Sequence, residues 1–245
     1  MMTRYQISLA GLAVLFCFSL LSGQTVFGQQ AIGSVVALEG EAVAVRSSGM
    51  EEELGSGADV FLNDRILTRR RSRITIRFLD ESTLSQGENS EMVLNEFVFN
   101  PARKKDNAFQ VRMIQGAFRC ITGKIVEMNP ARFGLRTGKM TIGIRGTDIG
   151  IEINPYTGEE NLLVFDLHRR ELEVAPGVAG LEPFVVTTPF VQFQVTEKGV
   201  EQRALTQAEA KRFIKKSAPK GAPPPGGPTP ASGVKMDMPP WLENR

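Results

Sequence analysis

The chain has 245 residues, of which 42% are hydrophobic and 23% are charged, and its formal net charge at pH 7 is only +2. This balance is typical of a globular domain of moderate size. The near-neutral charge and the 7% content of Phe, Trp and Tyr argue against nucleic acid as a partner. A single histidine and two cysteines exclude a multi-histidine metal centre and the usual zinc ligand sets, and we expect no cofactor.

Residues 1–28 have the layout of a secretory signal peptide. Arg4 precedes an apolar run from Ile7 to Leu21, and small or polar residues follow that run. We expect cleavage after Gly28, which leaves a periplasmic or secreted protein without an integral membrane span. The alternative is an uncleaved run that anchors the protein in the inner membrane, because it approaches the roughly 20 residues that a span requires.

Cleavage of the signal peptide is expected to separate the two cysteines. Cys17 lies inside the apolar run and leaves with it, whereas Cys120 stays in the mature chain. A single cysteine cannot form an internal disulfide, so the exported fold must be stabilised by its core. We interpret Cys120 as a small buried or edge residue.

Residues 29–200 repeat a two-residue hydrophobic period in short segments. Turn signals rich in Gly, Pro, Asn and Asp separate these segments, and no helical pattern lies between them. This spacing predicts an all-β fold, an antiparallel-rich sandwich or roll of short strands. The segments read as strands are GSVVALEGEAVAVR, SRITIRFL, MVLNEFVF, AFQVRMIQGAFR, TIGIRGTDIGIEI, NLLVFDL, RELEVA and FVVTTPFVQFQV.

The segment TIGIRGTDIGIEI changes face in its middle. Its isoleucines stand at even positions before Gly146 and at odd positions after it. Such a switch requires an extra residue in a bulge or a corner, and glycine supplies the permissive backbone. We expect Thr147 and Asp148 to bond nearby amides and Arg145 to pair with Asp148 across the corner. We therefore interpret the stretch as a structural corner, with a ligand-binding corner as the alternative.

The sequence offers no convincing catalytic constellation. A nucleophile triad or a thiol–imidazole pair would have to use His168, which falls at an expected exposed turn. The carboxylates Asp80, Glu81 and Glu88 are the obvious candidates for glycoside hydrolysis, yet they lie in turns without a signature. We predict that the protein is not an enzyme, and keep an envelope glycan hydrolase as a less favoured alternative.

Two further features could contact a partner. The run RRRSR places Arg69, Arg70, Arg71 and Arg73 together, as a solvated strand end or a contact for an acidic partner. The only tryptophan, Trp241, lies in the segment MPPWLENR and could dock on a partner or fold back.

One helix is predicted near the C-terminus, within residues 201–217. Thr206 and Glu209 have the spacing of a capping box, and Ala210 and Phe213 share one face. Residues 218–245 are rich in Pro and Gly and lack periodicity, which predicts a disordered tail.

In their order, these segments resemble the FecR domain, an all-β module of the bacterial envelope. The family pattern has a Gly and an Asp before a threonine-ended turn, an Asp-Gly-Ser turn with a G-x-N-S segment, a G-x-F/V-R segment and an R-G-T-D/E strand. The resemblance covers about residues 33–175, and Glu81 and Gly138 depart from the pattern at two turns. The matching residues are Asp64, Thr68, Asp80, Ser82, Gly87, Asn89, Ser90, Gly116, Phe118, Arg119, Arg145, Gly146, Thr147 and Asp148.

This resemblance implies a non-enzymatic role. Full regulators of the family carry a cytoplasmic segment that engages a sigma factor, a membrane span and a periplasmic part that senses an outer-membrane receptor. Few residues precede the apolar run here, so we expect a stand-alone exported FecR-domain protein. We predict a binding or scaffold module for an envelope protein or glycan, with a membrane-retained accessory of envelope signalling as the alternative.

Overall fold

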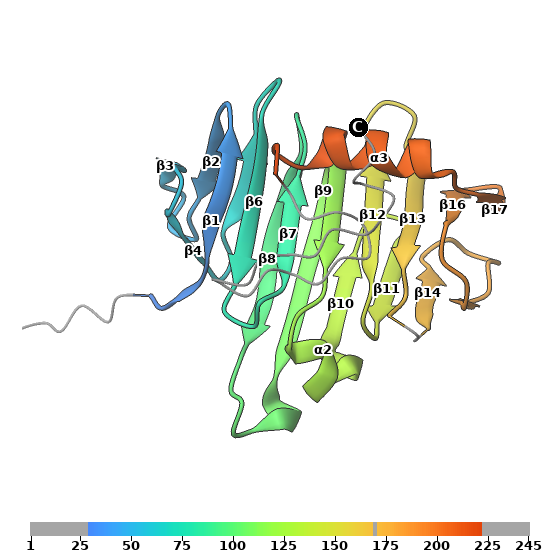
Figure 1. The fold of residues 1–245 in the computed structure, drawn as a ribbon, viewed down its shortest axis with the longest axis horizontal. Coiled ribbons are helices and arrows are strands. Elements are labelled where there is room, and N and C mark those ends of the chain that lie inside the picture. Colours follow the sequence, from blue (N-terminus) through green and yellow to red (C-terminus); the bar gives the residue numbers. More distant parts are fainter. Residues whose placement is uncertain (1–28, 169–170, 222–245) are drawn as a thin grey trace, which may run out of the picture. The chain divides into compact units, whose positions relative to one another are not determined.

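The computed structural model describes residues 29–168 and 171–221 (Figure 1). The predicted signal peptide and Trp241 lie outside the described residues, as does the tail beyond Gly221. The chain divides into two compact units, Met1–Gln30 and Ala31–Arg245, and the fold below is that of the second. Within the described ranges, no helix combines the length and the apolar character needed to cross a membrane.

The described residues contain seventeen strands, which form one connected set of pairings that divides into two sheets. The pairs are antiparallel except for one, between β9 and β10. From edge to edge, the first sheet contains β4 (Asp59–Phe61), β1 (Ala31–Glu39), β6 (Arg73–Phe78), β7 (Thr83–Gln86), β9 (Ala108–Ile121), β12 (Asp148–Ile153), β13 (Glu160–Asp166), β16 (Val191–Thr196) and β17 (Gly199–Ala204).

The second sheet has the same number of members and shares β9 with the first. From edge to edge it contains β3 (Glu51–Glu53), β2 (Ala42–Val45), β5 (Arg65–Thr68), β8 (Glu91–Val98), β9, β10 (Phe133–Arg136), β11 (Met140–Ile144), β14 (Leu172–Pro176) and β15 (Phe184–Val186). The predicted all-β class, rich in antiparallel pairs and with one C-terminal helix, is confirmed.

The strand β9 belongs to both sheets because it bends at Gly116. Its first half pairs with β8 and β10, and its second half pairs with β7 and β12. Gly116 has φ +105°, and a Cβ atom there would overlap the hydroxyl oxygen of Ser90. Only glycine therefore fits the bend that carries the strand from one sheet to the other.

Alternating apolar side chains from these strands form the larger of two hydrophobic clusters in the described residues, and the smaller cluster includes Phe165 and Phe213. Several phenylalanines lie within the larger cluster: the rings of Phe109 and Phe133 stack with their centroids 4.6 Å apart, and Phe78 meets Phe109 edge-on at 4.9 Å. Cys120 is buried and free, and burial raises the pKa of its thiol. This placement agrees with the interpretation of Cys120 as a small buried residue.

Three short helical turns interrupt the strands: η2 (Lys104–Asp106), α2 (Ile125–Met128) and η3 (Pro130–Arg132). Hydrophobic periodicity did not predict them, because elements of three or four residues are too short to show a period.

The C-terminal helix α3 (Gln207–Ser217) begins six residues later than the predicted segment, since Gly199–Ala204 form the edge strand β17. The expected capping box is present: Thr206 Oγ1 accepts from Glu209 N, and the Glu209 carboxylate accepts from Thr206 N at 2.8 Å. The helix crosses β9, β12 and β13 (Figure 1). Phe213 packs where Gly150 of β12 leaves space for its ring, 5.8 Å from the ring of Phe165.

The chain stays on the domain beyond the helix. Ala218 is buried, and Lys220 N donates to Glu39 Oε1 of β1 at 2.8 Å. The predicted tail therefore does not leave the domain at residue 218, and residues up to Gly221 are part of the described fold.

Candidate functional site

The R-G-T-D corner moves the chain between the two sheets. β11 belongs to the second sheet and β12 to the first, and Gly146 between them has φ +113°. Thr147 N donates to Thr122 Oγ1 at 3.0 Å, which holds the corner against the end of β9. The expected bond from the Thr147 side chain to a nearby amide is wrong, because Thr147 Oγ1 is buried without a hydrogen-bond partner among the described residues. The face switch in the isoleucine pattern thus corresponds to a change of sheet.

The expected pair between Arg145 and Asp148 is wrong. Asp148 is buried and binds Arg119 of β9, with Nε to Oδ1 at 2.9 Å and Nη2 to Oδ2 at 2.6 Å. Arg145 is exposed and pairs with Glu173 of β14. The two residues are neighbours in sequence, but the corner sends one side chain into the sandwich and the other to its surface.

Asp64 is part of a network that closes one end of the sandwich. Its Oδ2 accepts from Phe61 N at 2.7 Å and pairs with the Arg46 guanidinium. The same guanidinium binds Glu52 of β3 at 2.7 Å and lies 4.7 Å from the centroid of the Phe61 ring of β4. Arg46 therefore ties edge strands of both sheets together, a role that its position at the end of a predicted strand did not reveal.

The residues of the G-x-N-S segment form a hydrogen-bonded turn. Thr68 Oγ1 donates to Gly87 O and accepts from Ser90 N at 3.1 Å. Ser90 Oγ accepts from Ala117 N of β9 at 3.1 Å, next to the bend at Gly116. Glu88 and Asn89 of this segment are both exposed, and Asn89 has φ +50°.

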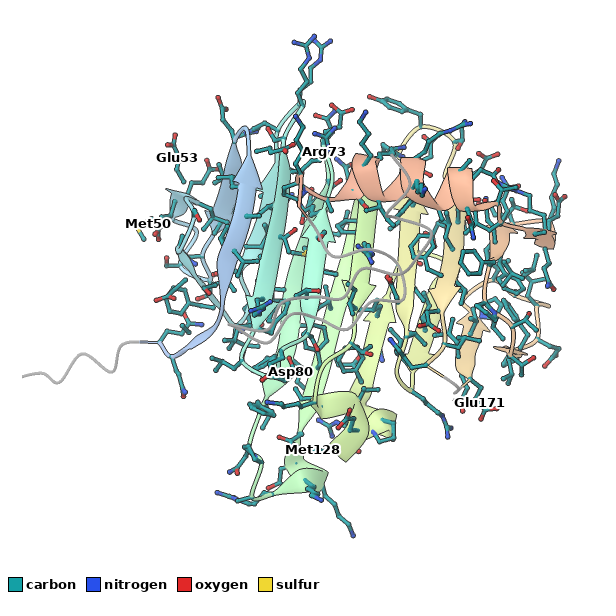
Figure 2. All side chains as sticks on the ribbon, in the orientation of Figure 1. Met50, Glu53, Arg73, Asp80, Met128 and Glu171 are labelled. Carbon is teal, nitrogen blue, oxygen red and sulfur yellow. The ribbon has the colours of Figure 1, made fainter. Side chains whose placement is uncertain are left out.

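Asp80 holds the turn between β6 and β7 against α2, at the end of the sheets where Figure 2 labels it. Its Oδ2 accepts from Ser82 Oγ at 2.7 Å and from Ile125 N at 3.3 Å, and its Oδ1 accepts from Ser82 N at 3.1 Å. No cation is among these partners, and burial raises the pKa of Asp80 above its ordinary value.

The three carboxylates considered for hydrolysis do not converge. Glu81 pairs with Lys124 on the surface beside Asp80. Glu88 lies beyond the opposite end of β7, where its Oε2 accepts from Arg71 N at 2.8 Å. A pair that flanks a scissile bond would have to project across one cleft.

His168 and Cys120 are also apart. His168 lies at an exposed turn, and its Nε2 is 3.5 Å from Asp166 Oδ2. Cys120 pairs in register with Ile149 inside the first sheet. Across residues 29–168 and 171–221, no group of three or more His, Cys, Asp or Glu could hold a metal ion.

The basic run RRRSR forms the turn between β5 and β6. Arg69, Arg70 and Arg71 are exposed there. Arg73, labelled in Figure 2, is engaged instead: Nη1 binds Glu39 at 3.0 Å and Nε donates to Lys216 O of α3 at 3.3 Å. Three of the four arginines considered as partner contacts are thus accessible.

A polar groove of about 570 Å³ opens beside this end of the domain. We call it the Tyr156 groove, because Tyr156 on the turn between β12 and β13 is 96% exposed. It collects side chains from the turn after β7, from the bend in β9 and from the last turn of α3. Its lining residues are Glu88, Asn89, Gln115, Gly116, Ala117, Glu152, Ile153, Asn154, Pro155, Tyr156 and Lys216.

A groove of about 480 Å³, lined by both apolar and polar residues, lies between the edge strands β15 and β17. We call it the edge groove. The rings of Phe184 and Phe193 meet in it with centroids 4.9 Å apart, and Val185 is 52% exposed. Its lining residues are Leu181, Glu182, Phe184, Val185, Val186, Thr187, Thr188, Phe193, Val200 and Gln202.

Reasoning from sequence missed both grooves. Tyr156 stood in a recognised turn signal, Asn-Pro-Tyr-Thr-Gly, but nothing in the sequence joined that turn to Gln115 or Lys216. The segment FVVTTPFVQFQV was read as one strand region, although Phe184–Val186 and Val191–Thr196 belong to different sheets.

Comparison with known proteins gives one family match. Residues 64–166 match the family model described as "FecR protein". No curated protein matches the chain.

Similar solved structures include two of a protein from Parabacteroides distasonis ATCC 8503 described as a "putative anti-sigma factor". They are 12% identical, with TM-scores of 0.47 and 0.48, and the match covers 61% of this chain and 64% and 63% of theirs. The chain thus spans less than two thirds of their length. A "Cell surface anchoring domain" is 29% identical with a TM-score of 0.25, over 25% of this chain and 82% of that chain.

Proposed function

Since residues 64–166 of this chain match the FecR family model, we propose that it is a non-enzymatic binding module of the bacterial envelope. Its partner is an envelope protein that adds an extended segment to the exposed edge strand β15. The apolar run at the N-terminus directs the module to the periplasm or the exterior.

The composition of the edge strands is the observation that carries this proposal. Four edge strands border the two sheets within the described residues: β3, β4, β15 and β17. β3 consists of three glutamates, β4 contains Asp59, and β17 contains Glu201 and Arg203. Charged side chains of this kind discourage the pairing of a further strand. β15, with the sequence Phe-Val-Val, has none.

The surroundings of β15 favour an apolar, extended partner. β15 pairs with β14 on one side, and no other described strand pairs with it. The accessible apolar side chains in the lining of the edge groove beside it include those of Phe184, Val185 and Val200. A partner strand would gain main-chain hydrogen bonds along β15 and would insert alternate apolar side chains into this groove.

The placement of the buried carboxylates supports a role without catalysis. Asp80 and Asp148 satisfy groups of the fold itself, Ser82 and Ile125 in one case and Arg119 in the other. Carboxylates bound in this way stabilise turns and strand pairs, and they are not presented to a substrate.

Cross-linking in intact envelopes tests the proposal. The tagged protein is captured with its cross-linked partner, and the capture is repeated with Val185→Lys and Val36→Lys. Both positions are exposed valines, 52% and 44%, but Val36 lies on β1 of the first sheet, whereas Val185 lies on β15 of the second. We expect Val185→Lys to abolish capture of one reproducible protein and Val36→Lys to keep it. Equal capture by both variants would contradict strand addition at β15.

A membrane-retained accessory of envelope signalling is the second candidate, and the family match favours it. The N-terminal sequence of the tagged protein itself distinguishes the exported module from the membrane-retained accessory. A start near Gln29 supports an exported module, whereas a retained Met1 together with membrane signalling proteins supports the accessory.

A further inference from the structure

We propose that the Tyr156 groove is a binding site for an uncharged saccharide chain. The groove shares no lining residue with the edge groove, so this site is independent of strand addition at β15. Its volume of about 570 Å³ lies within the range of roughly 300–1,000 Å³ that is common for small-ligand sites.

The exposure of the Tyr156 ring is the first argument for a saccharide site. The phenol is 96% exposed, although an aromatic side chain of this size normally buries much of its surface. The turn that presents it is ordered: Asn154 Oδ1 accepts from Tyr156 N at 2.9 Å and from Thr157 N at 3.3 Å, and Asn154 O accepts from Gly158 N at 2.9 Å. A ring on a fixed turn is a platform on which the C–H face of a sugar ring can stack at low entropic cost.

The polar side chains around the ring are the second argument. Asn89, Gln115 and Asn154 bring three primary amides to the groove from three separate segments. An amide donates and accepts at once, which matches a hydroxyl group that does the same. One hydrogen bond already fixes part of this set, from Gln115 Nε2 to Asn89 O at 3.3 Å.

The charges of the groove select the class of saccharide. Lys216 is paired with Glu152, so its ammonium group is already neutralised. Glu88 is the remaining charged side chain of the lining, and its Oε2 accepts from Arg71 N at 2.8 Å. The lining therefore carries a net negative charge, which disfavours phosphate or sulfate groups inside it, while carboxylates accept hydrogen bonds from sugar hydroxyls.

Solution NMR of the intact protein tests this site directly. The side-chain amide signals of Asn89, Gln115 and Asn154 are followed during titration with N-acetylchitotetraose, with maltotetraose and with inorganic phosphate. We expect at least one tetrasaccharide to shift these signals saturably at millimolar concentration or below, and phosphate to leave them unchanged.

Matched variants separate stacking from folding. Tyr156→Ala should weaken binding at least tenfold, and Tyr156→Phe should keep it, because the ring face remains. Gln115→Ala should weaken binding, whereas Gln202→Ala in the edge groove should not. All four variants are expected to keep the melting temperature within a few degrees.

Three outcomes would overturn the saccharide site: neither tetrasaccharide shifts the amide signals, Tyr156→Ala binds as the unchanged protein does, or phosphate produces the shifts instead. Val185→Lys distinguishes this site from the partner edge. It should abolish capture of the protein partner and leave the saccharide titration unchanged.

Discussion

Arg119 and Asp148 form a two-point ion pair between β9 and β12, with both side chains only 1% exposed. The distances are 2.9 Å from Nε to Oδ1 and 2.6 Å from Nη2 to Oδ2. The pair joins the G-x-F/V-R segment to the R-G-T-D segment, so two motifs that are 29 residues apart in sequence act as one unit.

Removal of the carboxylate should be strongly destabilising. Asp148→Ala leaves a buried guanidinium without its anion, and we expect a loss of about 3–5 kcal/mol in the free energy of unfolding. Chemical denaturation measures this change. The control is Glu173→Ala, which breaks the exposed pair with Arg145 and should cost no more than about 1 kcal/mol. Similar losses for both variants would contradict the buried role of Asp148.

The bend in β9 predicts that replacing Gly116 destabilises the fold. Gly116→Ala places a methyl group against Ser90 Oγ at a positive φ, so we expect a loss of more than about 1 kcal/mol in the free energy of unfolding. Gly55→Ala is the control because its Cβ meets no atom within 4 Å, and its effect should stay within about 0.5 kcal/mol. A harmless Gly116→Ala would mean that β9 does not depend on this glycine.

Asp80 predicts a dependence of stability on pH. Its folded-state pKa is raised by burial, so the folded protein binds a proton more readily than the unfolded chain does. The contribution of Asp80 to the free energy of unfolding therefore increases as the pH falls from above its raised folded-state pKa toward the ordinary pKa of an aspartate. Asp80→Asn removes this titration and keeps the size of the side chain, although its single acceptor oxygen replaces only one of the two carboxylate oxygens.

Denaturation of both proteins at neutral pH and at about pH 4.5 checks the sign. Relative to Asp80→Asn, the unchanged protein should gain stability at the lower pH. A relative loss on acidification would show that Asp80 is stabilised as an anion.

The end of the helix predicts the effect of truncation. A chain that ends after Ser217 loses the buried Ala218 and the bond from Lys220 N to Glu39, so we expect its melting temperature to fall by a few degrees. A chain that ends after Gly221 keeps both and should melt with the full chain. If the longer truncated chain melts much lower, residues 222–245 contribute to the fold.

The period of two in the sequence predicted the fold class because alternation is a local property of each strand. The corner at Gly146 was predictable for the same reason, because the buried isoleucines stand at even positions before it and at odd positions after it. Strand pairing was not predictable in this way. The partners of β9 come from four different strands, and Gly116 was noted as a motif residue without any indication that the strand changes sheet there.

The candidate sites were harder to predict than the fold because their residues meet only in three dimensions. Arg145 and Asp148 are close in sequence and were expected to pair, yet each found a partner on another strand. The Tyr156 groove joins two turns, the bend in β9 and the end of α3, and no pattern in the sequence linked these segments. Arg46 showed no sign of its role because its partners Asp64 and Glu52 lie on other segments.

The membership of β9 in both sheets also sets an order for folding during synthesis. The strand pairing of its first half is complete only once β10 (Phe133–Arg136) has been made. The pairing of its second half requires β12 (Asp148–Ile153). Until Ile153 has been made, the central strand keeps an open edge, and contacts of such long sequence separation form slowly. The incomplete chain therefore stays vulnerable to proteases and to aggregation until most of the two sheets exists, and both sheets then close together.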